Sequence, residues 1–254
     1  MTVAEAVPPV VRVESLTMAF GDDVIQRDLT FDIRRGEVLA IVGASGCGKS
    51  TLLRHLIGLN VPAVGRVLYG EQDLHHCEDD VLGELRRRFG VMFQAGALWS
   101  SMSVGDNVML PLRLFSELDH DEREQRARWK LALVGLEEAF DLEPAELSGG
   151  MRKRAAIARA LALDPELLYL DEPSSGLDPF SATRLDGLIL NLRRHLGTTV
   201  VMVTHSIDSV FAVADRVLYL DHLEKTMTAL DTPQVLAEHG PDRVRRFLQR
   251  TARP

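Results

Sequence analysis

The stretch GASGCGKST, from Gly43 to Thr51, decides the fold of this 254-residue chain. It ends the apolar run EVLAIVG and leads into KSTLLRHLIGL, an order that predicts a strand, a glycine-rich turn and a helix. Glycines let the backbone wrap a phosphate group, and the exposed N–H groups at a helix start attract an anion. The sequence therefore predicts a phosphate-binding loop in an α/β fold.

The residue types in this loop indicate a bound nucleotide. Gly43, Gly48, Lys49 and Ser50 fit the pattern G-x-x-x-x-G-K-[ST], in which the lysine meets β- and γ-phosphate oxygens and the hydroxyl binds Mg²⁺. A purely structural glycine turn would not need lysine and serine at those positions. The expected nucleotide-binding residues of the loop are Gly43, Ala44, Ser45, Gly46, Cys47, Gly48, Lys49, Ser50 and Thr51.

Four short, nearly all-apolar runs predict buried parallel strands: EVLAIVG, RFGVMFQ, ELLYLDE and TTVVMVTH. They end in Gly43, Gln94, Asp171 with Glu172, and His205. Ligands of open parallel sheets bind outside the carboxyl ends of the strands. We therefore expect these side chains, which are far apart in sequence, to meet at one site.

Each of these groups has a chemical role to fill there. Asp171 closes an apolar strand, where a carboxylate is costly unless it meets a cation such as Mg²⁺, and Glu172 is placed to act as general base. Gln94 is a candidate to orient water or contact the metal, and His205 to hydrogen-bond the γ-phosphate. An acidic helix N-terminus and backbone-capping side chains are the alternatives. Phe20 is a candidate to stack on a base, or else a core residue.

The rest of the chain divides into segments with different patterns of apolar and polar residues. VVRVESLTMAF and VIQRDLTFDIRRG alternate apolar and polar residues, as antiparallel strands with one wet face do. Residues 95–160 contain helical patterns and no strand-like run, so we predict a helical insertion between core segments 1–94 and 161–225. Residues 226–254 form an expected C-terminal extension, with Val244, Phe247 and Leu248 on one helical stripe that docks on its own domain.

Composition narrows the possible partners. The net charge of −8 argues against nucleic acid, and two cysteines without a disulfide pattern favour a reducing compartment. No signal peptide is expected, and the longest apolar runs fall far short of the ~20 residues that cross a bilayer. Any role at a membrane therefore requires another chain that spans the bilayer. HHCEDD, residues 75–80, predicts a polar turn before a helix rather than a metal site.

With GASGCGKS, Gln94, LSGGM at 147–151, LLYLDE, SSGLD and His205 in this order, the chain resembles the ATPase subunit of an ABC transporter over nearly its whole length. The resemblance implies a RecA-like P-loop NTPase core with an antiparallel β subdomain and an inserted α-helical subdomain. It also implies ATP and Mg²⁺ as ligands. Two such subunits are expected to sandwich two ATP head to tail beside an integral membrane permease.

The same resemblance assigns a second glycine turn to the neighbouring subunit. It implies that Ser148, Gly149 and Gly150 cap the ATP held by the opposite subunit, and it makes Asp178 part of the D-loop. Arg152, Lys153 and Arg154 follow within the first turns of a helix, where cations oppose the helix dipole. We interpret this broken local rule as a further hint that the turn serves a neighbour's ATP.

The transported substrate is indicated by the stretch after Gln94. AGALWSSMSVGDNVMLPLR resembles the Mla/Mkl-type ATPases that energise lipid movement between bacterial membranes, with Trp99 in place of phenylalanine. That resemblance implies a membrane-anchored, lipid-binding partner and a peripheral location on the cytoplasmic face of the inner membrane. Met151 and Phe20 depart from the commoner glutamine and tyrosine of the family. An amino-acid-type importer is the nearest alternative, and a non-transport ATPase of DNA repair or translation is a more distant one.

Overall fold

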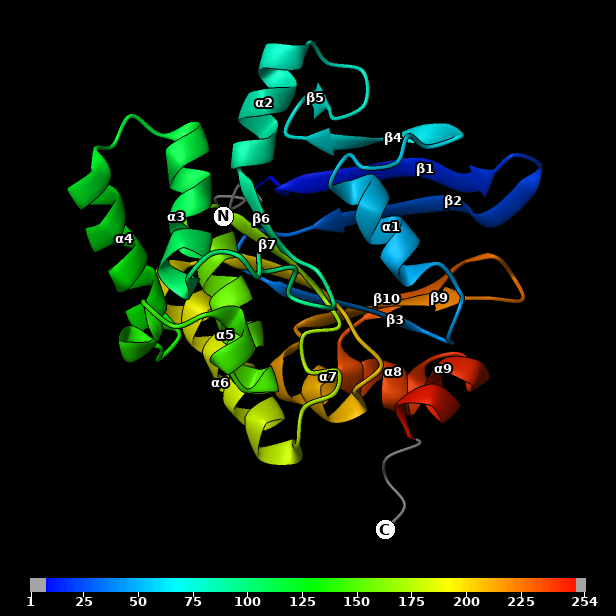
Figure 1. Cartoon of the computed structure of the whole chain (residues 1–254). Coiled ribbons are helices and arrows are strands. Elements are labelled where there is room, and N and C mark those ends of the chain that lie inside the picture. Colours follow the sequence, from blue (N-terminus) through cyan, green and yellow to red (C-terminus); the bar gives the residue numbers. More distant parts are fainter. Residues whose placement is uncertain (1–7, 250–254) are drawn as a thin grey trace, which may run out of the picture.

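Two β-sheets organise the computed structural model, which describes residues 8–249 (Figure 1). The first is a four-stranded antiparallel sheet in the order β2-β1-β4-β5. Its strands are β1 (Val11–Phe20), β2 (Asp23–Ile33), β4 (Val64–Tyr69) and β5 (Gln72–Asp73). The two strands expected from the period-two pattern are β1 and β2, which pair with Val11 opposite Ile33.

The second sheet has six strands in the order β10-β9-β3-β8-β7-β6. They are β3 (Val38–Gly43), β6 (Phe89–Met92), β7 (Leu167–Asp171), β8 (Thr199–Val203), β9 (Arg216–Asp221) and β10 (Thr226–Asp231). All neighbours are parallel except the β9–β10 pair. The four predicted strands are present and parallel; β3, β7 and β8 are buried throughout, whereas the edge strand β6 is only partly buried. The expected C-terminal extension, however, begins with an edge strand of this sheet.

Alternate side chains of β3 enter two separate cores, as the period-two geometry of a strand requires. Val38, Ala40 and Val42 join a cluster with the helices, among them α5 (Gly149–Ala160) and α6 (Pro179–Leu196). Leu39 and Ile41 point to the opposite face and pack with α1 (Lys49–Leu56) and the antiparallel sheet. Both faces of the six-stranded sheet are therefore covered.

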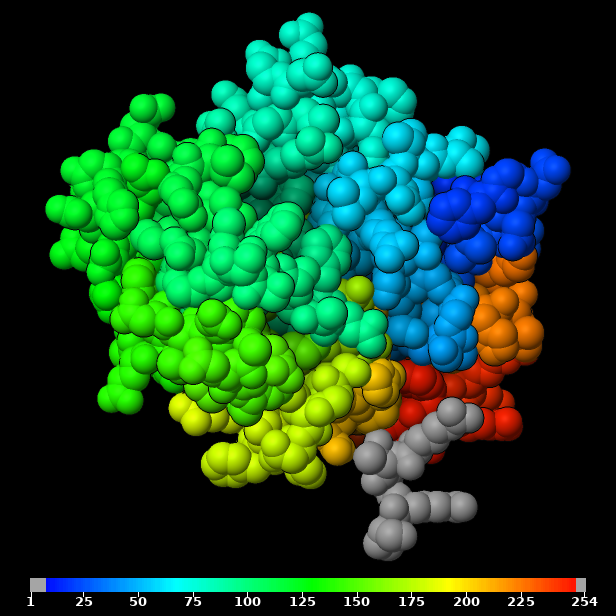
Figure 2. All heavy atoms as spheres, viewed as in Figure 1, coloured from blue at the N-terminus to red at the C-terminus, as the bar shows by residue number. Residues whose placement is uncertain are grey.

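The region from 95 to 160 forms the helical part of the molecule, in green in Figures 1 and 2. It contains α3 (Val104–Phe115), α4 (His120–Leu133), the short 3-10 turns η1 (Glu137–Ala139) and η2 (Pro144–Glu146), and α5. Local capping fixes where these helices begin: Ser103 accepts the N–H of Asp106, and Asp119 forms a capping box with Glu122. This agrees with the helical pattern in the sequence.

The remaining helices are α2 (Asp79–Arg87), α7 (Ile207–Val213), α8 (Pro233–His239) and α9 (Asp242–Leu248). In α9, Val244 and Leu248 are buried and the ring of Phe247 packs edge-on against Tyr219 at 5.4 Å, so the described part of the tail docks on its own domain. Pro241 is the N-cap of α9. Across residues 8–249, no helix combines the length and apolar character that crossing a bilayer demands.

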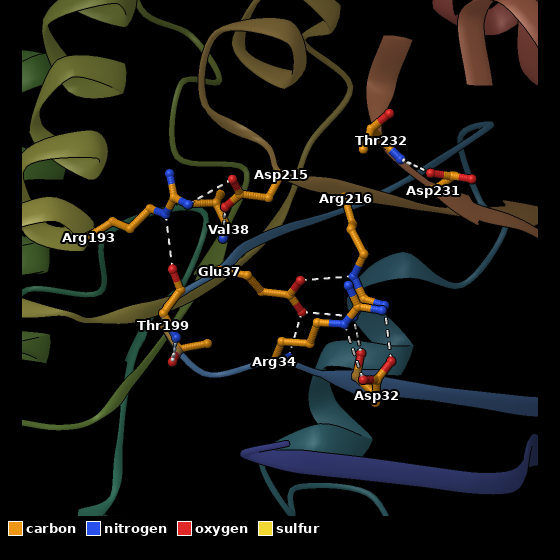
Figure 3. A network of polar contacts seen from close by, with 11 residues as sticks. Asp32, Arg34, Glu37, Val38, Arg193, Thr199, Asp215, Arg216, Asp231 and Thr232 are labelled. Atoms are coloured by element: carbon orange, nitrogen blue, oxygen red, sulfur yellow. Dashed lines mark hydrogen bonds and ion pairs between the residues drawn. The ribbon is translucent and has the colours of Figure 1, made fainter. Parts of the chain in front are cut away.

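A network of ion pairs joins the two sheets at the amino ends of β3 and β9 (Figure 3). The guanidinium of Arg216, only 9% exposed, pairs with Glu37 at 2.8 Å and with Asp32 of β2 at 3.0 Å. Beside it, Arg193 of α6 pairs with Asp215, whose carboxylate also accepts the N–H of Val38. These contacts hold the start of β3, and the phosphate-binding loop lies at its other end.

Candidate active site

The glycine loop between β3 and α1 adopts a backbone that only glycine fits at its last position. Gly48 is the N-cap of α1 with φ 97°, and a Cβ there would lie 2.7 Å from Cγ2 of Ile25. No side chain caps this helix start. Its first N–H groups therefore remain available to an anionic ligand, in the way that phosphate-binding helices use them.

Lys49, the first residue of α1, is held at the centre of this loop. Its ammonium donates to the carbonyl oxygens of Gly43 and Ala44, at 3.0 Å each, and the residue is 9% exposed. Since the loop itself fixes the position of the charge, the ammonium is pre-positioned for a phosphate that enters the loop. Cys47 of the same loop is buried, and burial raises the pKa of its thiol.

A cavity of about 460 Å³ opens over the loop, at the carboxyl ends of the parallel strands. It brings together the loop after β3 and the residues that follow β6, β7 and β8. Its lining residues are Ile25, Ser45, Gly46, Gly48, Lys49, Ser50, Thr51, Gln94, Glu172 and His205. The structure therefore gathers the polar groups for which the sequence predicts one site.

Asp171 reaches this cavity through a hydrogen bond from Ser50, whose Oγ lies 3.1 Å from its Oδ1. Burial raises the pKa of Asp171, and the hydrogen bond from Ser50 opposes that rise. A hydroxyl, a carboxylate and the amide of Gln94 at the cavity wall are hard oxygen donors of the kind that Mg²⁺ prefers. The residues present therefore fit a magnesium ion.

Glu172 and His205 form an ion pair across the cavity when the histidine is protonated. Nδ1 of His205 lies 2.7 Å from Oε2 of Glu172. Glu172 has φ 50°, a left-handed conformation that costs a non-glycine residue about 1–2 kcal/mol. Its N–H donates to Val203 of β8 at 2.9 Å. Backbone strain of this kind gathers at functional residues.

The second glycine turn lies outside the cavity, against the start of α6. Ser148 is the N-cap of α5, and a Cβ on Gly149 or Gly150 would meet Leu177 at 3.6 Å or Ser181 at 3.4 Å. Asp178, the N-cap of α6, accepts the N–H of Ser181 at 3.0 Å. Within residues 8–249, the cavity wall includes none of Ser148, Gly149, Gly150, Asp178 and Phe20. Phe20 is 59% exposed at the end of β1.

The interpretation of the three basic residues near the start of α5 has to be corrected. All three cations donate to backbone carbonyls of their own chain: Arg152 to Leu147, Lys153 to Gln94 and Glu172, and Arg154 to Val134 and Gly135. Their placement against the helix dipole thus has an explanation inside one subunit. The placement is therefore no hint of a neighbour's phosphate, in contrast to the interpretation from the sequence.

Sequence reasoning gave no role at this cavity to two residues that shape it. Ile25 of β2 lies against the phosphate loop and lines the cavity, and Lys153 contacts the backbone of both Gln94 and Glu172. Ile25 carries no sequence signal, because an isoleucine in a strand is ordinarily a core residue. For Lys153 the signal was its position four residues after a helix start, where a cation needs a compensating partner.

Comparisons with known proteins agree with this site. The family model described as ABC transporter matches residues 26–175. The intermembrane phospholipid transport system ATP-binding protein MlaF of Haemophilus influenzae is 38% identical, over 94% of this chain and 90% of that protein. The probable ribonucleotide transport ATP-binding protein mkl of Mycobacterium leprae is 40% identical, over 94% of this chain and 68% of its own length.

Among solved structures, the ATP-binding cassette MJ0796, described as a dimer in a post-hydrolysis state bound to ADP and Pi, matches with a TM-score of 0.78. The two chains are 31% identical, and the match covers 87% of this chain and 98% of that one. The phosphate loop, the converging strand ends and these likenesses point to one conclusion: the chain belongs to the ABC transporter family, among its ATP-binding ATPases.

Proposed function

We propose that this chain is the ATP-hydrolysing subunit of an ABC transporter that moves phospholipid or a related lipid between bacterial membranes. The observation that carries the proposal is the likeness to MlaF of H. influenzae along 94% of the chain, together with the catalytic cavity. The stretch after Gln94, which resembles lipid-system ATPases, supports it. That stretch comes directly after Gln94 in the chain, so it is placed to couple ATP hydrolysis to a partner protein.

In this proposal the phosphate loop holds ATP. The N–H groups of residues 43–51 and the start of α1 surround the β-phosphate, and Lys49 binds the β- and γ-oxygens. Phe20, exposed at the end of β1, stacks on the adenine. Ser50, Gln94 and Asp171 hold Mg²⁺, which neutralises charge on the phosphates when it is bound.

Hydrolysis then needs a general base that takes a proton from water and a hydrogen-bond donor to the γ-phosphate. The carboxylate of Glu172 accepts a proton from water as the water oxygen attacks the γ-phosphorus and the bond to the ADP oxygen breaks. Gln94 orients that water. His205, 2.7 Å from Glu172, donates a hydrogen bond to a γ-phosphate oxygen and positions the carboxylate. Asp178 belongs to the D-loop beside the second glycine turn.

Two copies of the chain complete each site. Ser148, Gly149 and Gly150 of one subunit cap the γ-phosphate held by the phosphate loop of the other, which explains why this turn lies outside its own cavity. The dimeric arrangement of MJ0796 supports this. A homodimer is therefore the working ATPase, and it joins an integral membrane permease.

We also propose where the ATPase is located in the cell and how its chain divides into subdomains. The ATPase lies on the cytoplasmic face of the inner membrane, with a membrane-anchored, lipid-binding protein as a further partner. The core comprises 1–94 and 161–225, with the antiparallel sheet as the β subdomain, and 95–160 form the helical subdomain. Residues 226–254 form the extension, which opens with β10. Residues 1–7 and 250–254 of these divisions lie outside the described structure.

The test is to purify the complex that contains this ATPase and its permease and to identify the cargo. Organic extraction followed by mass spectrometry should find phospholipid or a related lipid, in excess over a membrane protein purified in parallel. Deletion of the gene should also weaken the outer-membrane barrier. A stoichiometric amino acid or sugar with no selective lipid would contradict the lipid proposal, and co-purification with ribosomes or DNA would contradict transport.

A further inference from the structure

One buried ammonium group touches the backbone of two proposed catalytic residues. Nζ of Lys153 donates to the carbonyl oxygen of Glu172 at 3.1 Å and to the carbonyl oxygen of Gln94. Lys153 is 8% exposed and belongs to α5, whereas Gln94 follows β6 and Glu172 follows β7. A single side chain thus joins the ends of two core strands to a helix of the inserted region.

The contact with Glu172 falls at a residue whose backbone is strained. Glu172 has φ 50°, so its peptide needs partners to stay in that orientation. The N–H of Glu172 donates to Val203 at 2.9 Å, and its carbonyl oxygen accepts from Lys153 and from the N–H of Ser175 at 3.2 Å. Lys153 is the side-chain donor among these partners. Its loss leaves the carbonyl oxygen of Glu172 with only the neutral hydrogen bond from the N–H of Ser175, which is weaker than one from an ammonium group.

Lys153 also lies on the helix that begins with the second glycine turn. Ser148 is the N-cap of α5, and Lys153 stands five residues later in the same helix. A helix moves as one body over such a short distance, because each residue is hydrogen-bonded to its neighbour one turn away. A shift of the Ser148 turn is therefore carried directly to the backbone of Glu172 and Gln94.

Two carboxylates of the proposed catalytic site act on this ammonium through its charge. Burial lowers the pKa of Lys153, and the carboxylates of Glu172 and Asp171 oppose that change. Both carboxylates belong to the proposed catalytic site. The lysine thus interacts with the site through charge as well as through its two carbonyl contacts.

We propose that Lys153 is a positioning residue that fixes the catalytic carboxylate of Glu172 and the Gln94 segment relative to the start of α5. The inference rests on the proposed function, in which Glu172 is the base and the Ser148 turn caps the opposite subunit's ATP. It adds a physical connection between the two ATP sites of the dimer. The Ser148 end of α5 contacts the ATP of the opposite subunit. Lys153 of the same helix positions Glu172, the base that hydrolyses the ATP of its own subunit.

The experiment replaces the donor and keeps the length of the side chain. In the purified full-length chain, Lys153→Met should lower kcat about 10- to 100-fold, the scale of a misplaced catalytic group, while KM and Mg-ADP affinity by calorimetry change less than about twofold. Lys153→Gln, which keeps an N–H donor without the charge, should recover part of kcat. Lys130→Met removes another buried lysine, one that pairs with Asp164, and should cost stability but leave the kcat of folded protein unchanged.

A double-mutant comparison separates positioning from general stability. If Lys153 acts through Glu172, adding Lys153→Met to Glu172→Gln should lower the residual rate no further. An unchanged kcat in Lys153→Met, no recovery of kcat in Lys153→Gln relative to Lys153→Met, or a further loss of the same factor on the Glu172→Gln background would overturn the inference. Near-normal turnover of Glu172→Gln alone would instead remove the proposed base, so the two failures are distinguishable.

Discussion

His205 and Glu172 lie within 2.7 Å of each other, measured from Nδ1 to Oε2, although they follow different strands of the core sheet. The pairing follows from the backbone, because the N–H of Glu172 donates to Val203 and so ties the end of β7 to the end of β8. The carboxylate is 13% exposed and the imidazole 66% exposed. The histidine is therefore the more accessible partner of the pair.

This arrangement predicts the behaviour of Glu172→Gln. The amide keeps the shape and the contact with His205 but cannot accept a proton from water, so kcat should fall about 10²- to 10⁴-fold. Mg-ATP binding should persist, because the phosphate loop, Ser50 and Asp171 are untouched, and ATP-bound dimers should accumulate. Steady-state phosphate release and size-exclusion chromatography in Mg-ATP are the measurements.

Glu166→Gln is the matched control, since Glu166 immediately precedes the opposite end of β7. It pairs with Arg35 at 2.7 Å and with Arg88, on the side away from the cavity. This control should lose some stability and keep its turnover per folded molecule. Turnover near the original rate in Glu172→Gln would remove Glu172 from the role of base.

Two glycines of the phosphate loop should respond differently to alanine. Both have positive φ, but a Cβ on Gly46 meets nothing within 4 Å, whereas one on Gly48 lies 2.7 Å from Ile25. Gly46→Ala should cost about 1–2 kcal/mol of stability, the usual strain of a left-handed residue. Gly48→Ala should cost clearly more, because it adds a steric clash. Thermal unfolding without nucleotide measures both.

Ile25→Ala tests the cause of that difference. In the Gly48→Ala background it removes the clashing methyl group, so the double variant should lose less stability than the two single changes add up to. Strict additivity of the two changes would mean that the backbone strain at Gly48, and not the contact with Ile25, makes alanine unacceptable there.

The sequence could predict the cavity because its cause is simple. Parallel strands place their carboxyl ends at one edge of a sheet, so Gly43, Gln94, Glu172 and His205 had to come close once the four strands were recognised. The order of apolar runs and polar ends carries that information along the chain. Lys153 could not be found in this way, because its partners are backbone carbonyls that no residue pattern reveals.

Other parts of the molecule lie beyond such reasoning for different physical reasons. The sequence pattern does not reveal β10, because Thr226–Asp231 is a half-exposed edge strand whose pairing with β9 depends on a short turn rather than on an apolar pattern. The roles proposed for Ser148 and Gly150 depend on a second copy of the chain. A single folded subunit places Gly149 beside Leu177 and Gly150 beside Ser181.

The docking of α9 should make stability depend on acid pH through Asp221. Burial raises the pKa of Asp221, but the N–H groups of Leu223 and Glu224 and the guanidinium of Arg243 lower it more, so the net pKa lies below 3.8. Its favourable contribution is then present above that value and is lost as the pH falls through the folded-state pKa. Arg243→Met should therefore move acid unfolding to higher pH.

Arg245→Met provides the control, because Arg245 lies on the same helix and pairs with Asp242 at the surface. Exposed pairs contribute little, so its acid transition should stay near that of the original chain. Far-UV circular dichroism from pH 7 down to pH 3 follows both variants. Identical transitions for Arg243→Met and Arg245→Met would show that the Asp221 contact does not support the fold in acid.

The last prediction tests the division of each ATP site between two subunits. Lys49→Ala disables a phosphate loop, and Ser148→Arg places a bulky cation where the turn must approach phosphate, so each homodimer should be inactive. In a heterodimer of the two, one composite site carries both lesions. The other joins the intact loop of the Ser148→Arg chain to the intact turn of the Lys49→Ala chain. That site is chemically whole, and it should recover single-turnover hydrolysis.

Rapid-quench measurement on heterodimers purified with two different tags is the assay. The isolated Ser148→Arg subunit should still bind Mg-ATP, since its own cavity does not include Ser148. Ser148 also caps α5, so its replacement costs about 1 kcal/mol in any case, and Ser103→Arg, which removes the equivalent cap of α3, controls for that loss. If Ser148→Arg instead abolishes ATP binding by its own subunit while Ser103→Arg does not, the turn serves its own chain's nucleotide and the shared-site proposal fails.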